Sequence, residues 1–105
     1  NLIAIIDENK IQALGKTKEV LDLSPIAKKW AVFGFSVREI DGHDFEQIEK
    51  TLLEVPFEKE RPSAIIAHTT KGKGVSFMEN RVEWHYKYAD QQQLHQAWSE
   101  LGALQ

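Results

Sequence analysis

The chain has 105 residues, 42% of them hydrophobic and 28% charged, which is enough for one modest hydrophobic core. Its thirteen Lys and Arg residues are scattered among sixteen Asp and Glu residues, so no basic stripe offers a surface to nucleic acid. The absence of cysteine excludes disulfides and zinc-thiolate sites and favours a cytoplasmic location. No apolar run approaches the roughly 20 residues of a membrane span. Because Asn1 is not an initiator Met and leads directly into an apolar run, we expect an N-terminal portion to precede this sequence.

The first part of the chain predicts one strand and one helix. Residues 2–6 are continuously apolar, which indicates a strand buried on both faces, as in a parallel sheet. After a polar stretch that extends to Asp22, a helix is predicted over residues 24–33. Ser24 is the expected N-cap, with Pro25 in the first helical position. The apolar face of this helix is expected to contain Ile26, Trp30 and Phe33.

The alternation of strands and helices then continues. Residues 35–40 are rich in Phe, Val and Ile and predict a second strand. A helix is predicted over residues 44–54, begun by Asp44 with Gln47 three positions later, and residues 63–68 predict a third strand. The apolar face of this second helix is expected to contain Phe45, Ile48 and Leu52. This order predicts an α/β fold, doubly wound around a mostly parallel sheet.

The last third of the chain differs in character. Residues 69–88 carry glycines and predict irregular structure. Asp90, with Gln93 three residues later, then begins a final helix. Its apolar residues are Leu94, Ala97, Trp98 and Leu101.

The loop after the first strand contains groups that suit a hard cation. In open α/β sheets ligands bind outside the carboxyl ends of the strands. Residues 7–12 supply the Asn9 amide oxygen and free backbone carbonyls there, and Mg²⁺ prefers such oxygens. A plain turn is the simpler interpretation, because Asp and Asn favour turns. The residues alone leave both interpretations open.

Two later features suit phosphate. Residues 69–74 combine glycines with Lys71 and Lys73, but they lack the full P-loop pattern, and from the residues alone a solvated basic turn is the favoured interpretation. His85 lies between Trp84 and Tyr86 in the irregular segment, where an imidazole can donate to phosphate or to a substrate oxygen. The other candidates, His43 and His95, fit a structural or merely exposed role better.

Taken together and in order, several phrases resemble the transketolase family, in particular the thiamine-diphosphate-binding N-terminal subunit of transketolases split into two chains. Each phrase is common alone, but their order and spacing are specific. The matching residues are 1–7, 9–12, 37–44, 65–69, 71–80 and 84–85.

The resemblance implies a cofactor site. Within the family pattern, Mg²⁺ is bound by the Asn9 side chain, by the Ile11 backbone carbonyl, by cofactor oxygens and by an Asp in a Gly-Asp-Gly turn that this sequence lacks. Lys71 matches a position near thiamine diphosphate. His85 matches a histidine that contacts the diphosphate and the sugar, which makes it the catalytic candidate. Tyr86 departs from the family's usual glycine, and this departure bears on the local loop shape and on the substrate.

The resemblance also implies an activity and partners. The expected reaction transfers a two-carbon ketol unit between sugar phosphates. Residues 1–105 are then the C-terminal part of the diphosphate-binding domain, and we expect this chain to be inactive without the N-terminal half and a pyrimidine-binding subunit, in a dimer or heterotetramer. Two alternatives are a related enzyme using this cofactor, such as a deoxyxylulose-phosphate synthase or a 2-oxo acid dehydrogenase component, and a non-catalytic α/β module descended from the domain.

Overall fold

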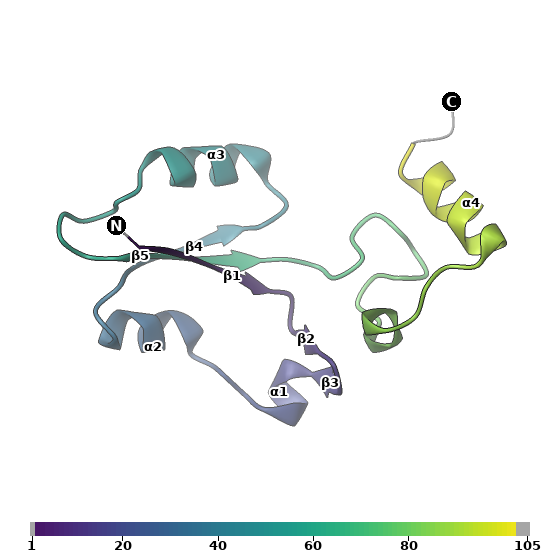
Figure 1. Cartoon of the computed structure of the whole chain (residues 1–105), viewed down its shortest axis with the longest axis horizontal. Helices are drawn as coiled ribbons and strands as arrows, with labels where there is room; N and C mark the ends of the chain where they lie inside the picture. The colour runs from purple at the N-terminus through teal and green to yellow at the C-terminus, as the bar shows by residue number, and fades with distance from the viewer. Residues whose placement is uncertain (1, 103–105) are drawn as a thin grey trace.

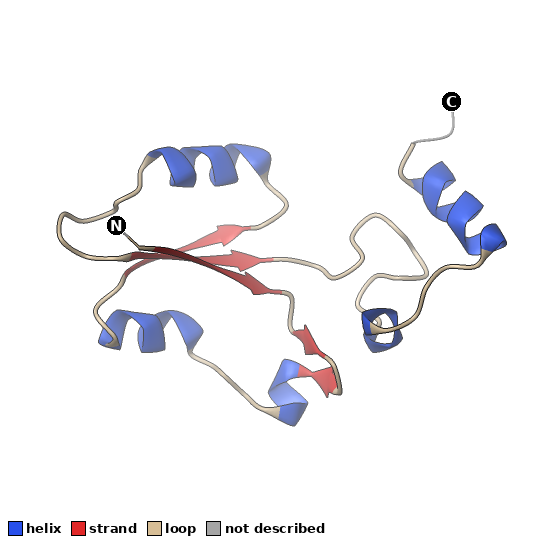
Figure 2. Cartoon of the chain, viewed as in Figure 1, coloured by secondary structure: helices blue, strands red, loops and turns tan. Residues whose placement is uncertain are grey.

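The computed structural model describes residues 2–102, so Asn1, where the first matched phrase begins, lies outside the described residues. A three-stranded sheet forms one part of the molecule, and a two-stranded hairpin and three helical segments, residues 17–20, 82–85 and 91–100, lie beyond its end (Figure 2). The strands are β1 (Ile3–Glu8), β2 (Ile11–Gln12), β3 (Gly15–Lys16), β4 (Ser36–Asp41) and β5 (Ser63–His68). The helices are α1 (Thr17–Val20), α2 (Ile26–Val32), α3 (Phe45–Leu53), the 3-10 helix η1 (Val82–His85) and α4 (Gln91–Glu100).

The sheet is parallel, with strand order β1-β5-β4. Glu8 and Asp41 both lie beside His68, so the carboxyl ends of the three strands lie at the same end of the sheet. Helices α2 and α3 lie on opposite sides of the sheet (Figure 1). The predicted doubly wound α/β fold is therefore confirmed.

The hydrophobic core is centred on β5, where Ala64, Ile65 and Ile66 are buried. The prediction that the first strand is buried on both faces is wrong for this chain. Ile3 and Ile5 in β1 are exposed, and Ile5 retains 61% of its accessible surface. The reason is the position of β1 at a sheet edge, because α3 packs on β4 and leaves this face of β1 open within residues 2–102.

Two details of the predicted helices are also wrong. Helix α2 begins at Ile26 after Pro25, and no side chain caps it, so Ser24 is not the N-cap. The backbone N–H of Ser24 is instead used in a bond to the Asp22 carboxylate at 2.8 Å. Phe33 and Phe45, expected on apolar faces, are more than 80% exposed; Phe33 is the C-cap residue of α2, and Phe45 is the first residue of α3.

The polar stretch before Asp22 has structure that its composition did not predict. β2 and β3 form a short antiparallel hairpin, in which Ile11 pairs with Lys16. Helix α1 follows directly, and the Thr17 N–H donates to the Lys10 carbonyl at 2.9 Å. The loop after β1 is thereby closed into a compact unit.

The irregular segment and α4 extend away from the sheet (Figure 1). Asp90 and Gln93 form the predicted capping box at the start of α4. At the other end of the helix, the Glu100 carboxylate accepts from the backbone N–H and hydroxyl of Ser76, at 2.6 and 2.7 Å. These bonds hold the Glu100 pKa below its usual value and tie α4 to the preceding loop. No helix among residues 2–102 is both long and apolar enough to cross a membrane.

Candidate functional site

The loop after β1 is ordered by the side chain predicted to bind metal. The Asn9 Oδ1 atom accepts a hydrogen bond from the backbone N–H of Ile11 at 2.9 Å. This bond turns the chain directly after the strand, and the hairpin β2–β3 then fixes the next residues. The turn interpretation of this loop is therefore confirmed, whereas a metal-binding role of the Asn9 amide oxygen stays a prediction.

Lys10, between these two residues, has an unusual backbone conformation. Its φ angle is 66°, in the left-handed region that residues other than Gly, Asn and Asp seldom adopt. The hydrogen bonds made by Asn9 and by the Lys10 carbonyl hold this conformation. Residues with strained backbone conformations cluster at functional sites, because the strain costs stability and persists only where the surrounding structure enforces it.

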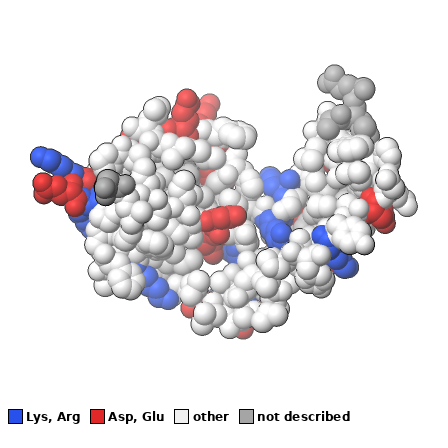
Figure 3. All heavy atoms as spheres, in the orientation of Figure 1, with Lys and Arg blue, Asp and Glu red and all other residues white. Residues whose placement is uncertain are grey.

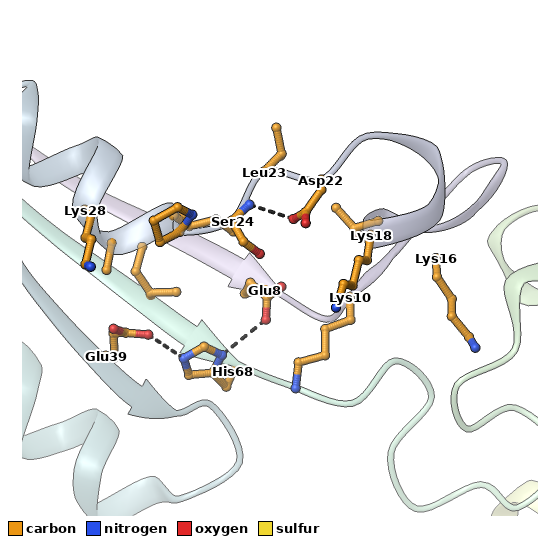
Figure 4. Close-up of a pocket in the computed structure, with 15 residues that line it drawn as sticks. Glu8, Lys10, Lys16, Lys18, Asp22, Leu23, Ser24, Lys28, Glu39 and His68 are labelled. Carbon is orange, nitrogen blue, oxygen red and sulfur yellow. Dashed lines mark hydrogen bonds and ion pairs between the residues drawn. The ribbon is translucent and has the colours of Figure 1, made fainter.

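His68, the last residue of β5, lies between two carboxylates (Figure 4). Its Nε2 atom is 2.8 Å from a Glu39 oxygen and its Nδ1 atom is 3.2 Å from a Glu8 oxygen. The bond to Glu39 raises the pKa of His68 above 6.5, and the bond to Glu8 adds to this rise, whereas partial burial opposes it. Three neighbouring strands are thus joined at their carboxyl ends by one imidazole.

Three hollows meet at this edge of the sheet. The largest, about 630 Å³, lies between the strand ends and helices α1 and α2. A second, about 380 Å³, lies between the loops after β4 and β5, and a third, about 240 Å³, contains Asn9 and Ile11. Lys10 lines all three. The Lys10 side chain, which follows β1, is therefore placed beside each of the three hollows.

The loop that carries Lys71 is folded tightly on itself. The Lys71 carbonyl accepts from the Asn80 N–H at 3.0 Å, and Gly72 has a φ of 72°. A Cβ atom at Gly72 would lie 2.8 Å from the Met78 backbone, so glycine is required by close packing as well as by backbone conformation. Lys71 itself is half-buried, and Lys73 is exposed beside it.

His85 is exposed at the end of η1. The preceding Trp84 anchors this helix, because its indole N–H donates to the Phe77 carbonyl at 2.8 Å and its ring packs on the Phe77 ring. η1 also contacts β2, the strand that begins at Ile11. Tyr86, where a glycine was expected by resemblance, is the residue after η1 and is largely exposed.

The structure brings the four predicted site residues to one end of the sheet by different means. Asn9 and Ile11 are directly bonded, and η1, which ends at His85, contacts β2, which begins at Ile11, whereas Lys71 lies in the loop after β5. Basic side chains gather in the hollow between the sheet and the C-terminal segment (Figure 3). The positive charge of these side chains would favour the binding of an anion there, and it would disfavour a cation that is not itself bound to an anion.

The donor chemistry of the Asn9 loop fits Mg²⁺ in part. An amide oxygen and a backbone carbonyl are hard oxygen donors, but Mg²⁺ needs six ligands. Among residues 2–102 no group of three His, Cys, Asp or Glu side chains is arranged to hold a metal ion. Any remaining ligands would therefore come from the cofactor, from water and from outside the described residues.

The fold is that of an α/β protein, and its candidate ligand site lies at the carboxyl ends of the parallel strands, where sheets of this kind bind their ligands. The profile of the family described as "Transketolase, thiamine diphosphate binding domain" matches residues 1–104. The chain belongs to the transketolase family. Its predicted resemblance to that family is therefore confirmed.

Individual relatives agree with this assignment. The chain is 40% identical over 101 residues to an apulose-4-phosphate transketolase subunit of Phocaeicola vulgatus, covering 96% of the chain and 36% of the relative. It is 40% identical over 85 residues to a 6-deoxy-6-sulfo-D-fructose transketolase subunit of a Clostridium species, covering 81% and 31%. It matches the solved transketolase of Campylobacter jejuni with a TM-score of 0.87 and 29% identity, over 97% of this chain and 16% of that one. The chain thus spans about a third of the curated subunits.

Sequence reasoning missed Lys10, His68 and the hydrogen bond that the His43 Nε2 atom accepts from the Thr70 N–H. The available signal was position, because all three lie at or directly after the ends of predicted strands, where an α/β sheet binds its ligands. Their partners were not foreseeable, since the strand order β1-β5-β4 decides that Glu8 and Glu39 flank His68.

Proposed function

We propose that this chain is the C-terminal part of the diphosphate-binding domain of a transketolase, and that the complete enzyme transfers a two-carbon ketol unit between sugar phosphates. The observation that carries the proposal is the contact of η1, which ends at His85, with β2, which begins at Ile11, in a chain matched by the family profile over residues 1–104. Its relatives are named as transketolase subunits, which supports a transketolase activity, but their names differ in the sugar and so do not fix the substrates of this chain.

In this proposal the residues of the chain bind the metal ion and the cofactor and orient the substrate. The Asn9 amide oxygen and the Ile11 carbonyl contribute two ligands to Mg²⁺, and Lys71 offsets diphosphate charge. His85 orients the substrate or transfers a proton at a substrate oxygen. Thiamine diphosphate, when bound, supplies the carbanion chemistry that amino-acid side chains lack.

The proposal requires partners. An Asp ligand and the remaining strands of the domain would come from an N-terminal half, and a second polypeptide would bind the pyrimidine ring. Several relatives are named as single subunits of a transketolase, which supports an assembly of unlike chains, such as a heterotetramer. A non-catalytic module descended from the domain is the competing candidate, and the Tyr86 substitution next to His85 favours it.

Metal-dependent binding of thiamine diphosphate to the complete subunit tests the cofactor site. Asn9→Ala should raise the Mg²⁺ and cofactor concentrations needed for half-saturation at least about tenfold, because it removes one oxygen ligand. Asn9→Asp is the matched control, since it keeps an oxygen that accepts from the Ile11 N–H and should bind within about threefold of the wild type. Unchanged titrations for Asn9→Ala would remove this residue from the site.

Steady-state kinetics on the same complete enzyme separate the active transketolase from the non-catalytic module. His85→Ala should lower kcat/KM by about 10 to 10⁴-fold at saturating cofactor, the range of a positioned acid-base group. His95→Ala is the control, because its ring lies against Trp98 on α4. Equal activity of the two variants at matched thermal stability would mean that His85 does not have the proposed role.

A further inference from the structure

The turn that follows β4 is hydrogen-bonded to the last residue of β5. The Gly42 N–H donates to the His68 carbonyl at 2.8 Å, and the His43 N–H donates to the Asp41 carboxylate at 2.9 Å. A side chain at Gly42 would press on Ala67 and on the His68 carbonyl, each 3.2 Å from the added Cβ, so only glycine allows this close approach. The backbone of His43 is thereby fixed beside the loop that follows β5.

The His43 side chain uses this position to bind the backbone of that loop. The Thr70 N–H donates to the His43 Nε2 atom at 2.7 Å. Nε2 must then carry no proton, so the ring is in the tautomer protonated at Nδ1. Thr70 immediately precedes Lys71, and the loop is held on its other side by Thr69, whose hydroxyl bonds to the Asp7 carboxylate.

The bond lies in the wall of a hollow that suits an anion. Its volume is about 380 Å³, and its lining includes His43, Thr70 and the two lysines Lys10 and Lys73, together with one carboxylate, Asp41, which accepts from the His43 N–H. Without the imidazole, the Thr70 amide would lose its acceptor, and the bonds of Thr69 and of the Thr70 carbonyl would remain to hold the chain before Lys71. The ring thus adds a restraint on the direction in which the lysine-bearing loop leaves β5.

We propose that His43 is a positioning residue, which preorganises the loop of residues 69–74 for a diphosphate group through the Thr70 amide. This inference rests on the proposed function, because it takes thiamine diphosphate as the ligand. It assigns to His43 a role beyond the structural or exposed one expected from the sequence. Preorganisation of this kind raises affinity by removing an ordering cost from the binding step.

The test compares His43→Ala with His43→Gln in the complete subunit, with His95→Ala as a distant control. Gln is the conservative variant because its Oε1 atom is an uncharged acceptor at a reach similar to that of Nε2. Two quantities are measured: the hydrogen-exchange rate of the Thr70 amide without ligand, and the Kd for thiamine diphosphate with Mg²⁺. Thermal unfolding midpoints are recorded for every variant.

We expect His43→Ala to speed Thr70 exchange and to raise the Kd, each by about tenfold, which corresponds to about 1.4 kcal/mol. His43→Gln should restore both to within about threefold, and unfolding midpoints should stay close to that of the wild type. Unchanged exchange in His43→Ala, or faster exchange with an unchanged Kd, would overturn the proposal. So would equal losses in the Ala and Gln variants, because they would indicate a role of the ring in stability alone. Failure of the wild type itself to bind would refute the proposed function, while the Thr70 exchange rate would still show whether His43 holds the loop.

Discussion

At the scale of single residues, the imidazole of His68 links stability to pH. Its pKa is raised, first by the hydrogen bond to Glu39 and then by the bond to Glu8, whereas partial burial of the ring opposes the rise (Figure 4). A raised pKa in the folded state means that the protonated ring stabilises the fold. This contribution is fully present below the ordinary value of 6.5 and is lost as pH rises through the folded-state pKa.

We therefore expect His68→Gln to destabilise the chain more at pH 5.5 than at pH 9. The difference between the two pH values should be about 0.5 to 1 kcal/mol, since the ring is 42% exposed and solvent screens its ion pairs. Urea unfolding of wild type and variant at both pH values measures it. His95→Gln is the control, and a destabilisation by His68→Gln that does not shrink as pH rises would contradict the assignment.

Single residues also show where sequence reasoning ends. Asn9 and Ile11 were identified because a family pattern names the residue types and their spacing, and the structure places them in one bonded turn. His43 could not be identified in this way, because its partner is a backbone amide 27 positions away. Every residue except Pro has a backbone N–H, so a pattern of side chains does not indicate which of these groups a distant histidine will bind.

At the scale of elements, the helix α4 depends on local chemistry that the sequence does predict. The Asp90 carboxylate accepts from the Gln93 N–H at 2.8 Å, and the Gln93 side chain accepts from the Asp90 N–H at 3.0 Å. Asp90→Ala should cost about 1 kcal/mol of helix stability, because the cap that satisfies the first turn is lost. Amide exchange along residues 91–100 measures this cost.

The exposed Ser99→Ala change in the same helix is the control, and it should leave exchange nearly unchanged. Faster exchange confined to the first turn of α4 after Asp90→Ala would agree with the cap. Exchange that increases equally throughout residues 63–102 would instead indicate that α4 unfolds together with β5, and the local account would be wrong.

Elements with a strong local signal were predicted, and those fixed by distant contacts were not. The parallel strands and α3 were predicted within one or two residues, because apolar runs, caps and turn residues lie within the segments themselves. The hairpin β2–β3 was missed because its strands have two residues each, too few to show a period. Exposure of Ile5 was missed because it depends on which neighbours cover the edge strand, and no local segment determines the strand order.

At the scale of the whole molecule, the chain is open for its size. Its radius of gyration is 16.6 Å, whereas a compact domain of this length has about 13 Å. Large apolar side chains on β1, α2 and α3 are exposed. Exposed apolar side chains on several neighbouring elements are typical of an interface. Their exposure agrees with the proposal that these residues form one part of a larger domain.

Two neighbouring isoleucines test this proposal. Ile5 and Ile65 lie side by side in register on β1 and β5, but Ile65 is 2% exposed and Ile5 is 61% exposed. In the 105-residue chain, Ile65→Ala should cost about 2 to 4 kcal/mol and Ile5→Ala less than about 1 kcal/mol, since only the first creates a cavity. In the complete subunit both should cost about the same, because the proposed N-terminal half covers β1. Urea unfolding of both variants in both proteins measures this, and a small cost for Ile5→Ala in the complete subunit would mean that β1 remains an uncovered edge there.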